Sequence, residues 1–152
     1  MISIHSLISS DCILINPPVN TKNELLRALV DILAEGGKVE DPDHLFEDVL
    51  EREKLASTAM GVGCAVPHVH SSGVEKTEIG VALIKEGIDF EAPDGQSVSL
   101  VIMIVGPAEK ARLHLKLLSK IARFLHDSEF RRQLMDANNP EEFLSLLKSK
   151  EG

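Results

Sequence analysis

A nearly unbroken aliphatic segment, residues 97–105, most limits the folds open to this chain. It reads SVSLVIMIV and ends at Gly106-Pro107. Aliphatic residues without polar alternation are typical of a strand buried on both faces. Residues 79–84 form a second strand of the same character, and Asp94-Gly95 marks a turn between the two. A sheet built from such strands needs cover on both sides.

Helix signals lie on both sides of these strands in the chain. Thr21 to Glu24 form a capping box, in which the hydroxyl and the carboxylate each satisfy an end amide. Asp41-Pro42 opens another helix with a cap followed by proline. A short strand at 12–15 precedes helices at 21–36, from 41 onward, at 108–125, at 129–135 and from 139 to about 148. Helices and sheet mixed in this way predict an α/β class fold, a three-layer α/β/α sandwich.

Size and composition favour one soluble globular domain over residues 1–152. The chain is 43% apolar and 26% charged, and no apolar run approaches the roughly 20 residues that span a bilayer. The N-terminal residues lack the basic and apolar regions of a signal peptide. Cys12 and Cys64 both lie in apolar runs, which favours reduced, buried thiols. We therefore expect a cytoplasmic protein.

The charge balance argues against a nucleic-acid partner. The net charge is −8, and the chain has five Phe but no Trp or Tyr. Such a chain offers neither the basic surface nor the stacking aromatics that nucleic acids require. An acidic face would instead attract a basic protein partner.

The strongest chemical signal is the segment GVGCAVPH, residues 61–68. It is an apolar, strand-like run with two glycines, which add backbone freedom, and a proline, which ends the strand just before His68. A histidine so placed is held firmly but stays reachable. Arg52, Thr58 and His114 also fall near the ends of predicted elements, with His114 in the middle of the apolar arc of its helix.

Each of these residues also has an ordinary structural interpretation. His114 fits a hydrogen-bonded core residue, Thr58 a turn residue, and Arg52 a surface residue paired with Asp48. His68 alone fits a polar strand end. Only the combination of these residues favours a catalytic site.

Three chemistries compete for this set. In the first, a neutral His68 takes a phosphoryl group and passes it on, while guanidinium and imidazole groups neutralise the phosphoryl oxygens. Such a carrier needs no cofactor, which agrees with the lack of a GxxxxGK[ST] or GxGxxG motif. In the second, His68, His70 and Cys64 bind a metal, although Pro67 makes a regular strand doubtful there. In the third, Cys64 is a nucleophile, which burial among aliphatic neighbours would make inert.

The chain resembles the enzyme IIA domains of the bacterial phosphoenolpyruvate-dependent sugar phosphotransferase system, in the fructose/mannitol class. This class includes the stand-alone nitrogen-regulatory IIA proteins. The resemblance rests on Glu51-Arg52-Glu53, Ser57-Thr58, residues 61–68, Leu113-His114-Leu115 and Phe130-Arg131. It extends from about residue 5 to residue 148 and implies a mixed central sheet between the helical layers.

The resemblance also implies roles for the site residues and partners. His68 would be phosphorylated by a phosphocarrier protein, His114 would bind the phosphoryl group or orient His68, Arg52 would supply positive charge, and Thr58 would line the pocket. The recipient would be a IIB domain in sugar transport, or a regulated kinase or potassium transporter. Because the chain ends at Gly152 without a IIB or IIC segment, we expect the regulatory form.

Two points remain open from the sequence. Many members carry a small residue and then a basic or polar one after the active histidine, whereas Val69-His70 stand here. We expect His70 to be a solvent-facing turn residue rather than a second imidazole of the site. A non-catalytic interaction module with the same fold is the competing function.

Overall fold

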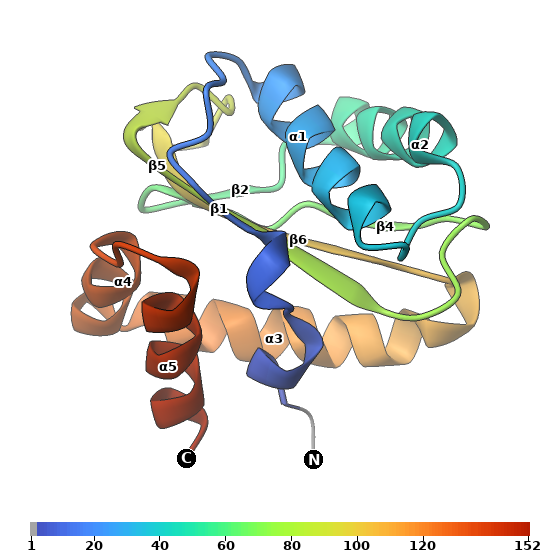
Figure 1. Cartoon of the computed structure of the whole chain (residues 1–152). Helices are drawn as coiled ribbons and strands as arrows, with labels where there is room; N and C mark the ends of the chain where they lie inside the picture. The colour runs from blue at the N-terminus through green and yellow to red at the C-terminus, as the bar shows by residue number, and fades with distance from the viewer. Residues whose placement is uncertain (1–2) are drawn as a thin grey trace.

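A mixed six-stranded sheet lies at the centre of the computed structural model, which describes residues 3–152 and leaves Met1 and Ile2 of the N-terminal segment outside (Figure 1). The strand order is β1-β5-β6-β3-β2, and β4 pairs with β6 beyond β3. The strands are β1 (Ile13–Ile15), β2 (Ala59–Gly61), β3 (Cys64–Ala65), β4 (His68–His70), β5 (Glu78–Ile88) and β6 (Val98–Gly106). β5 and β6 are antiparallel, whereas β1 pairs with β5, and β3 and β4 with β6, in parallel.

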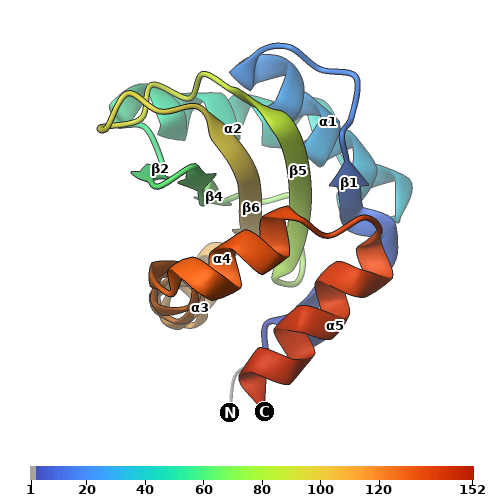
Figure 2. The same ribbon diagram turned by 90° about the vertical axis from the view of Figure 1, so that its left-hand side faces the viewer.

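Helices cover both faces of this sheet, as the sequence predicts (Figures 1 and 2). One layer is α1 (Lys22–Glu35) with α2 (Pro42–Leu55), and the other is α3 (Ala111–His126), α4 (Ser128–Met135) and α5 (Pro140–Glu151). Short 3-10 turns are η1 (His5–Leu7), η2 (Ser10–Cys12) and η3 (Ala108–Lys110). The predicted capping box at Thr21 and the Asp41 cap are both formed. Within residues 3–152, no helix is both long and apolar enough to span a bilayer.

The side chains of β6 alternate between two hydrophobic cores. Val101, Met103 and Val105 pack with α1 and α2, whereas Leu100, Ile102 and Ile104 pack with α3, α4 and α5. Because both faces are buried, the strand shows no polar alternation. The alternation also fixes which face of a neighbouring strand points toward α3.

The apolar run at residues 61–68 predicts a single strand, but the structure divides this segment among β2, β3 and β4. β2 and β3 form a tight antiparallel hairpin, and Val62 and Gly63 at its turn have φ values of 53° and 79°. Asp94 holds this turn, since its Oδ2 accepts a 3.0 Å hydrogen bond from the Val62 amide. Two residues with positive φ reverse the chain, which a periodicity of apolar residues does not reveal.

After Pro67 the chain returns to the edge of β6 as β4, so His68–His70 is a regular strand despite the preceding proline. Pro67 lies between β3 and β4, and its carbonyl accepts a 2.8 Å hydrogen bond from the Ile104 amide. The proline therefore sits where its missing N–H breaks no hydrogen bond of β3 or β4.

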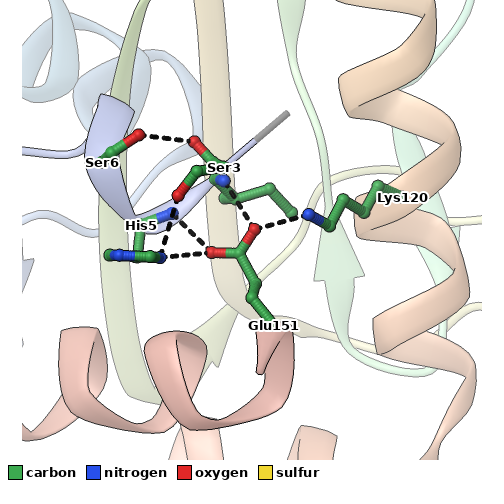
Figure 3. Close-up of polar contacts among 6 residues, drawn as sticks. Ser3, His5, Ser6, Lys120 and Glu151 are labelled. Carbon is green, nitrogen blue, oxygen red and sulfur yellow. Dashed lines mark hydrogen bonds and ion pairs between the residues drawn. The ribbon is translucent and has the colours of Figure 1, made fainter. Parts of the chain in front are cut away.

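Glu151 fastens the C-terminal helix to the start of the chain (Figure 3). Its carboxylate accepts hydrogen bonds from the Ile4 and His5 amides, at 2.7 and 2.9 Å, and from Lys120 Nζ at 2.6 Å. Burial alone would raise the pKa of Glu151, but the hydrogen bonds from Lys120, His5 and Ile4 outweigh it and hold that pKa at about 2. A charged Glu151 therefore joins α5, α3 and the N-terminal segment.

Candidate functional site

His68 and His70 point to the same face of the sheet. They are two residues apart on β4 and lie opposite Ile104 and Gly106 of β6 in the parallel register. Side chains at paired positions of neighbouring strands share a face, and Ile104 belongs to the α3-side core. Val69 between them packs instead with the α1 and α2 core. Both imidazoles therefore lie on the side of α3.

A backbone hydrogen bond determines which nitrogen carries the proton in the neutral His68 ring. Its Nδ1 lies 2.8 Å from the carbonyl oxygen of Val66. A carbonyl can only accept, so Nδ1 donates the proton and Nε2 keeps the lone pair in the neutral ring. His68 is half-buried, which agrees with the expectation of a ring held firmly but reachable.

His114 is buried in α3, with 3% of its surface exposed. Its Nε2 forms a 2.9 Å hydrogen bond with the Thr77 hydroxyl, whereas its buried Nδ1 has no partner among the described residues. Burial, and then positive charge on His70 and His68, lowers the pKa of His114 from 6.5 to about 4. His114 is therefore neutral at pH 7, and its Nδ1 is buried without a hydrogen-bond partner among the described residues.

His70 is exposed, as expected, but it lies in β4 instead of a turn, and its ring contacts the His114 ring. Its ring centroid lies 4.9 Å from that of His114, with the planes tilted by 37°. Gly106 makes the space, since a Cβ there would lie 2.7 Å from His114 Nε2. The i, i+2 spacing of His68 and His70 was the available signal, but it is meaningful only once residues 68–70 form a strand.

Arg52 lies in the last turn of α2, and Thr58 lies between α2 and β2. Arg52 Nη1 donates a 3.1 Å hydrogen bond to the Ala56 carbonyl at the end of α2 and does not form the expected pair with Asp48. Asp48 instead accepts a 2.8 Å hydrogen bond from the Ser71 hydroxyl. The helix that carries Arg52, α2, packs against β4, the strand that carries His68.

The Thr58 hydroxyl donates a hydrogen bond to Glu53, which also forms a 2.8 Å ion pair with Lys22. Val66 connects Thr58 to His68, since its amide donates to the Thr58 carbonyl at 3.1 Å and its carbonyl accepts from His68 Nδ1. Within residues 3–152, neither the Thr58 hydroxyl nor the Arg52 guanidinium hydrogen-bonds an imidazole of the cluster.

The competing chemistries find less support. Burial raises the pKa of the Cys64 thiol to about 12, against a smaller opposing effect of the Arg131 charge, so the thiol stays protonated. The described part of the chain contains no group of three His, Cys, Asp or Glu residues arranged to hold a metal ion.

Ser3, His5 and Glu151 imitate a catalytic triad, but His5 Nδ1 contacts both partners, at 3.0 and 2.6 Å. A serine nucleophile and a carboxylate need different nitrogens of the ring, so this arrangement cannot relay a proton.

Comparison with known proteins identifies the family of the chain. Residues 6–150 match the family model of the phosphoenolpyruvate-dependent sugar phosphotransferase system, EIIA 2. The chain belongs to this family. Members are phosphotransfer carriers, so the chain has a transferase-type role.

Relatives of both the regulatory and the transport kind are found. A nitrogen regulatory protein of Bradyrhizobium diazoefficiens is 37% identical over 95% of this chain and 94% of its own length. A fructose-specific EIIA component of Haloferax volcanii is 32% identical over 95% of this chain and 94% of its own. The 2-O-alpha-mannosyl-D-glycerate-specific EIIABC component of Escherichia coli is 33% identical over 100% of this chain, which spans only 23% of that protein.

Solved structures share the fold. The nitrogen regulatory protein IIA-Ntr from Neisseria meningitidis superimposes with a TM-score of 0.88 at 30% identity, covering 95% of this chain and 98% of that one. The mannitol IIA enzyme of Escherichia coli, in complex with phosphorylated IIB, gives a TM-score of 0.80 at 27% identity and covers 93% and 97%.

Proposed function

We propose that this chain is a cytoplasmic phosphohistidine carrier that acts as a single unit, with Nε2 of His68 as the phosphoryl acceptor. The observation that carries the proposal is the hydrogen bond from Nδ1 to the Val66 carbonyl. It leaves Nε2 as the nucleophile and holds the ring in place. The Nε2 lone pair forms the new N–P bond as the N–P bond of a phosphohistidine donor breaks, and the donor imidazole keeps that electron pair.

His114 is proposed to bind the phosphoryl group. Its unpartnered Nδ1 can donate a proton to a phosphoryl oxygen, provided that the Thr77 hydroxyl donates to Nε2. Because His114 is neutral at pH 7, it offers a hydrogen bond without the cost of burying a charge. Gly106 and Thr77 hold the ring in this orientation.

Arg52 is proposed to supply positive charge after a change of rotamer. Its present hydrogen bond to the Ala56 carbonyl is a single contact of a half-buried side chain, so little is lost when it turns toward β4. Thr58 is proposed to line the pocket through its backbone, since its hydroxyl is held by Glu53. No cofactor or metal enters this transfer.

A small phosphocarrier protein is the proposed donor, and we propose the nitrogen-regulatory role. The 37% identity to the Bradyrhizobium regulatory protein and the TM-score of 0.88 with the Neisseria IIA-Ntr support it. Phosphorylation would then control a kinase or potassium transporter. The alternative is a fructose- or mannitol-type IIA that passes phosphate to a IIB partner. The 32% identity to the fructose-specific EIIA component of Haloferax supports this alternative.

Intact-mass measurement tests the carrier function. The protein is incubated with phosphoenolpyruvate, enzyme I and the phosphocarrier protein, beside His68→Ala and the matched control His126→Ala, which removes an exposed imidazole from the end of α3. We expect one acid-labile phosphoryl group on the parent and on His126→Ala, and none on His68→Ala. Absence of the adduct from the parent with several donors that label a control IIA would favour the interaction module.

Adding a IIB domain to the labelled protein separates the two roles. Rapid loss of the label to a fructose- or mannitol-type IIB indicates transport. A label that persists with IIB, but that changes binding to a kinase or potassium transporter, indicates regulation.

A further inference from the structure

A hollow of about 540 Å³ lies beside the histidine cluster, between the N-terminal segment, the start of β5 and the first turn of α3. Its wall includes three lysines, Lys38, Lys76 and Lys110, but one carboxylate, Glu78. Its size falls within the range of small-molecule sites, roughly 300–1,000 Å³. A cationic hollow of this size is unexpected on a chain with a net charge of −8.

Two of the three lysines have no partner in the described structure. Lys38 lies 3.6 Å from Glu78 and 3.5 Å from the Cys12 sulfur. Lys76 and Lys110 are exposed, and their ammonium groups form no hydrogen bond or ion pair within residues 3–152. Unpaired ammonium groups that converge on one hollow raise the local concentration of anions.

Two further carboxylates lie close to the hollow. Glu40 and Glu75 line a neighbouring hollow of about 280 Å³, which shares Lys38, Lys76 and Glu78 with the first. In the described part of the chain neither of them forms an ion pair with any of the three lysines. The serine hydroxyls of Ser6 and Ser9 add hydrogen-bonding groups to the wall of the larger hollow. Ammonium and hydroxyl groups together suit phosphate oxygens.

We propose that this hollow binds a small metabolite with a multiply charged phosphate group, and that the occupant is coupled to His114 through Thr77. Thr77 is 7% exposed and forms part of the wall, while its hydroxyl holds His114 Nε2 at 2.9 Å. An anion that shifts Thr77 therefore shifts the orientation of the His114 ring. Coupling of this kind is reciprocal. The factor by which the metabolite changes the equilibrium for phosphorylation of His68 equals the factor by which phosphorylation changes the affinity for the metabolite.

Binding is tested without any phosphoryl transfer, with pyrophosphate as the probe. Amide resonances of the unphosphorylated protein are followed by ¹H–¹⁵N NMR at constant ionic strength. The variant Lys76→Gln/Lys110→Gln is compared with Lys116→Gln/Lys148→Gln, which loses the same charge from exposed positions outside the hollow. We expect saturable shifts at Thr77 and Leu113, an affinity at least about tenfold weaker in the first variant, and no more than a twofold change in the second.

Absence of saturable shifts in the parent, or an equal loss of affinity in both double variants, would overturn the binding site. The coupling rests on the proposed function and is tested separately. Saturating pyrophosphate should change the rate of His68 phosphorylation at least about threefold in the parent but not in Thr77→Val. Unchanged rates in both proteins overturn the coupling alone, whereas a failed carrier function leaves the binding result intact.

Discussion

The imidazole of His70 packs against that of His114, with ring centroids 4.9 Å apart. The two rings come from β4 and α3, and Gly106 of β6, which pairs with His70, leaves room for His114 because it has no side chain. His70 is exposed, whereas His114 is buried. The pair thus joins an exposed ring to a buried one.

Replacement of His70 by Gln should slow phosphoryl transfer to His68 by about tenfold. We attribute this to loss of a hydrogen bond from the imidazole to a phosphoryl oxygen, worth about 1.4 kcal/mol, which corresponds to a tenfold change in rate. Single-turnover transfer from the phosphorylated donor measures this rate. Removal of the positive charge should also raise the pKa of His114 above about 4, which an NMR titration measures.

The matched control for this variant is His126→Gln, an exposed histidine at the end of α3. It should leave both the transfer rate and the titration of His114 unchanged. A His70→Gln protein with the parental rate would remove His70 from the site.

Replacement of Gly106 by Ala should displace His114 and lower both stability and transfer. The new Cβ would lie 2.7 Å from His114 Nε2 and 3.2 Å from the Thr77 Cα, so the ring must move. We expect a loss of about 1–3 kcal/mol in the free energy of unfolding, typical of overpacking. Urea unfolding and single-turnover transfer measure the two effects.

Gly73→Ala is the control for the added methyl group. The nearest atom to a Cβ at Gly73 is the Asp41 amide nitrogen at 3.8 Å, an ordinary contact. Its stability and transfer rate should match the parent. Equal losses in the two variants would mean that glycine flexibility, and not the His114 contact, is what matters.

The fold could be predicted from local patterns because each pattern has a local physical cause. The apolar run at 97–105 indicates a strand buried on both faces, and the caps at Thr21 and Asp41 place two helix starts. The hairpin at Val62-Gly63 could not be predicted, since valine rarely takes a positive φ and its turn depends on Asp94, 32 residues away. Strand order depends on such distant contacts throughout.

The candidate site was predicted only in part for a similar reason. His68 and His114 are signalled by their positions at a strand end and on an apolar arc, and the charge of His68 contributes to lowering the pKa of His114. His70 and Thr77 join that cluster through the β4–β6 register and a contact 37 residues apart in the chain. Side-chain contacts of this kind follow from tertiary packing, so no local pattern announces them.

The pH dependence of stability should reveal the buried His114. Because its pKa is lower in the folded state, about 4 against 6.5, the folded protein binds fewer protons than the unfolded chain. The contribution of neutral His114 to the free energy of unfolding is therefore fully present above pH 6.5 and is lost as the pH falls through about 4. The difference in pKa corresponds to roughly 3 kcal/mol at about 1.4 kcal/mol for each tenfold change in proton affinity.

Urea unfolding of the parent and His114→Gln between pH 7.5 and pH 4, at about half-unit steps, measures this dependence. The parent should lose stability steadily as the pH falls, and the variant should show a smaller slope over the same interval. Parallel slopes would mean that His114 is solvated in solution and that its burial is not maintained.

Glu151→Gln should destabilise the protein by about 2 kcal/mol, because it weakens charge-assisted hydrogen bonds from Lys120, His5 and Ile4 at a site that is 6% exposed. The folded pKa of about 2 lies below the usual 4.5, so the charged form is the one that folding favours. The stabilisation is present above pH 4.5 and disappears as the pH falls through about 2. Urea unfolding at pH 7 and pH 3 should therefore show a difference in the free energy of unfolding between parent and variant that is smaller at the lower pH.

Glu129→Gln is the matched control. It removes a carboxylate from an ion pair with Arg132 in which both side chains are 67% exposed, and it should lower the free energy of unfolding by under about 0.5 kcal/mol. If both variants behave alike, the link between the ends of the chain is no stronger than a surface ion pair.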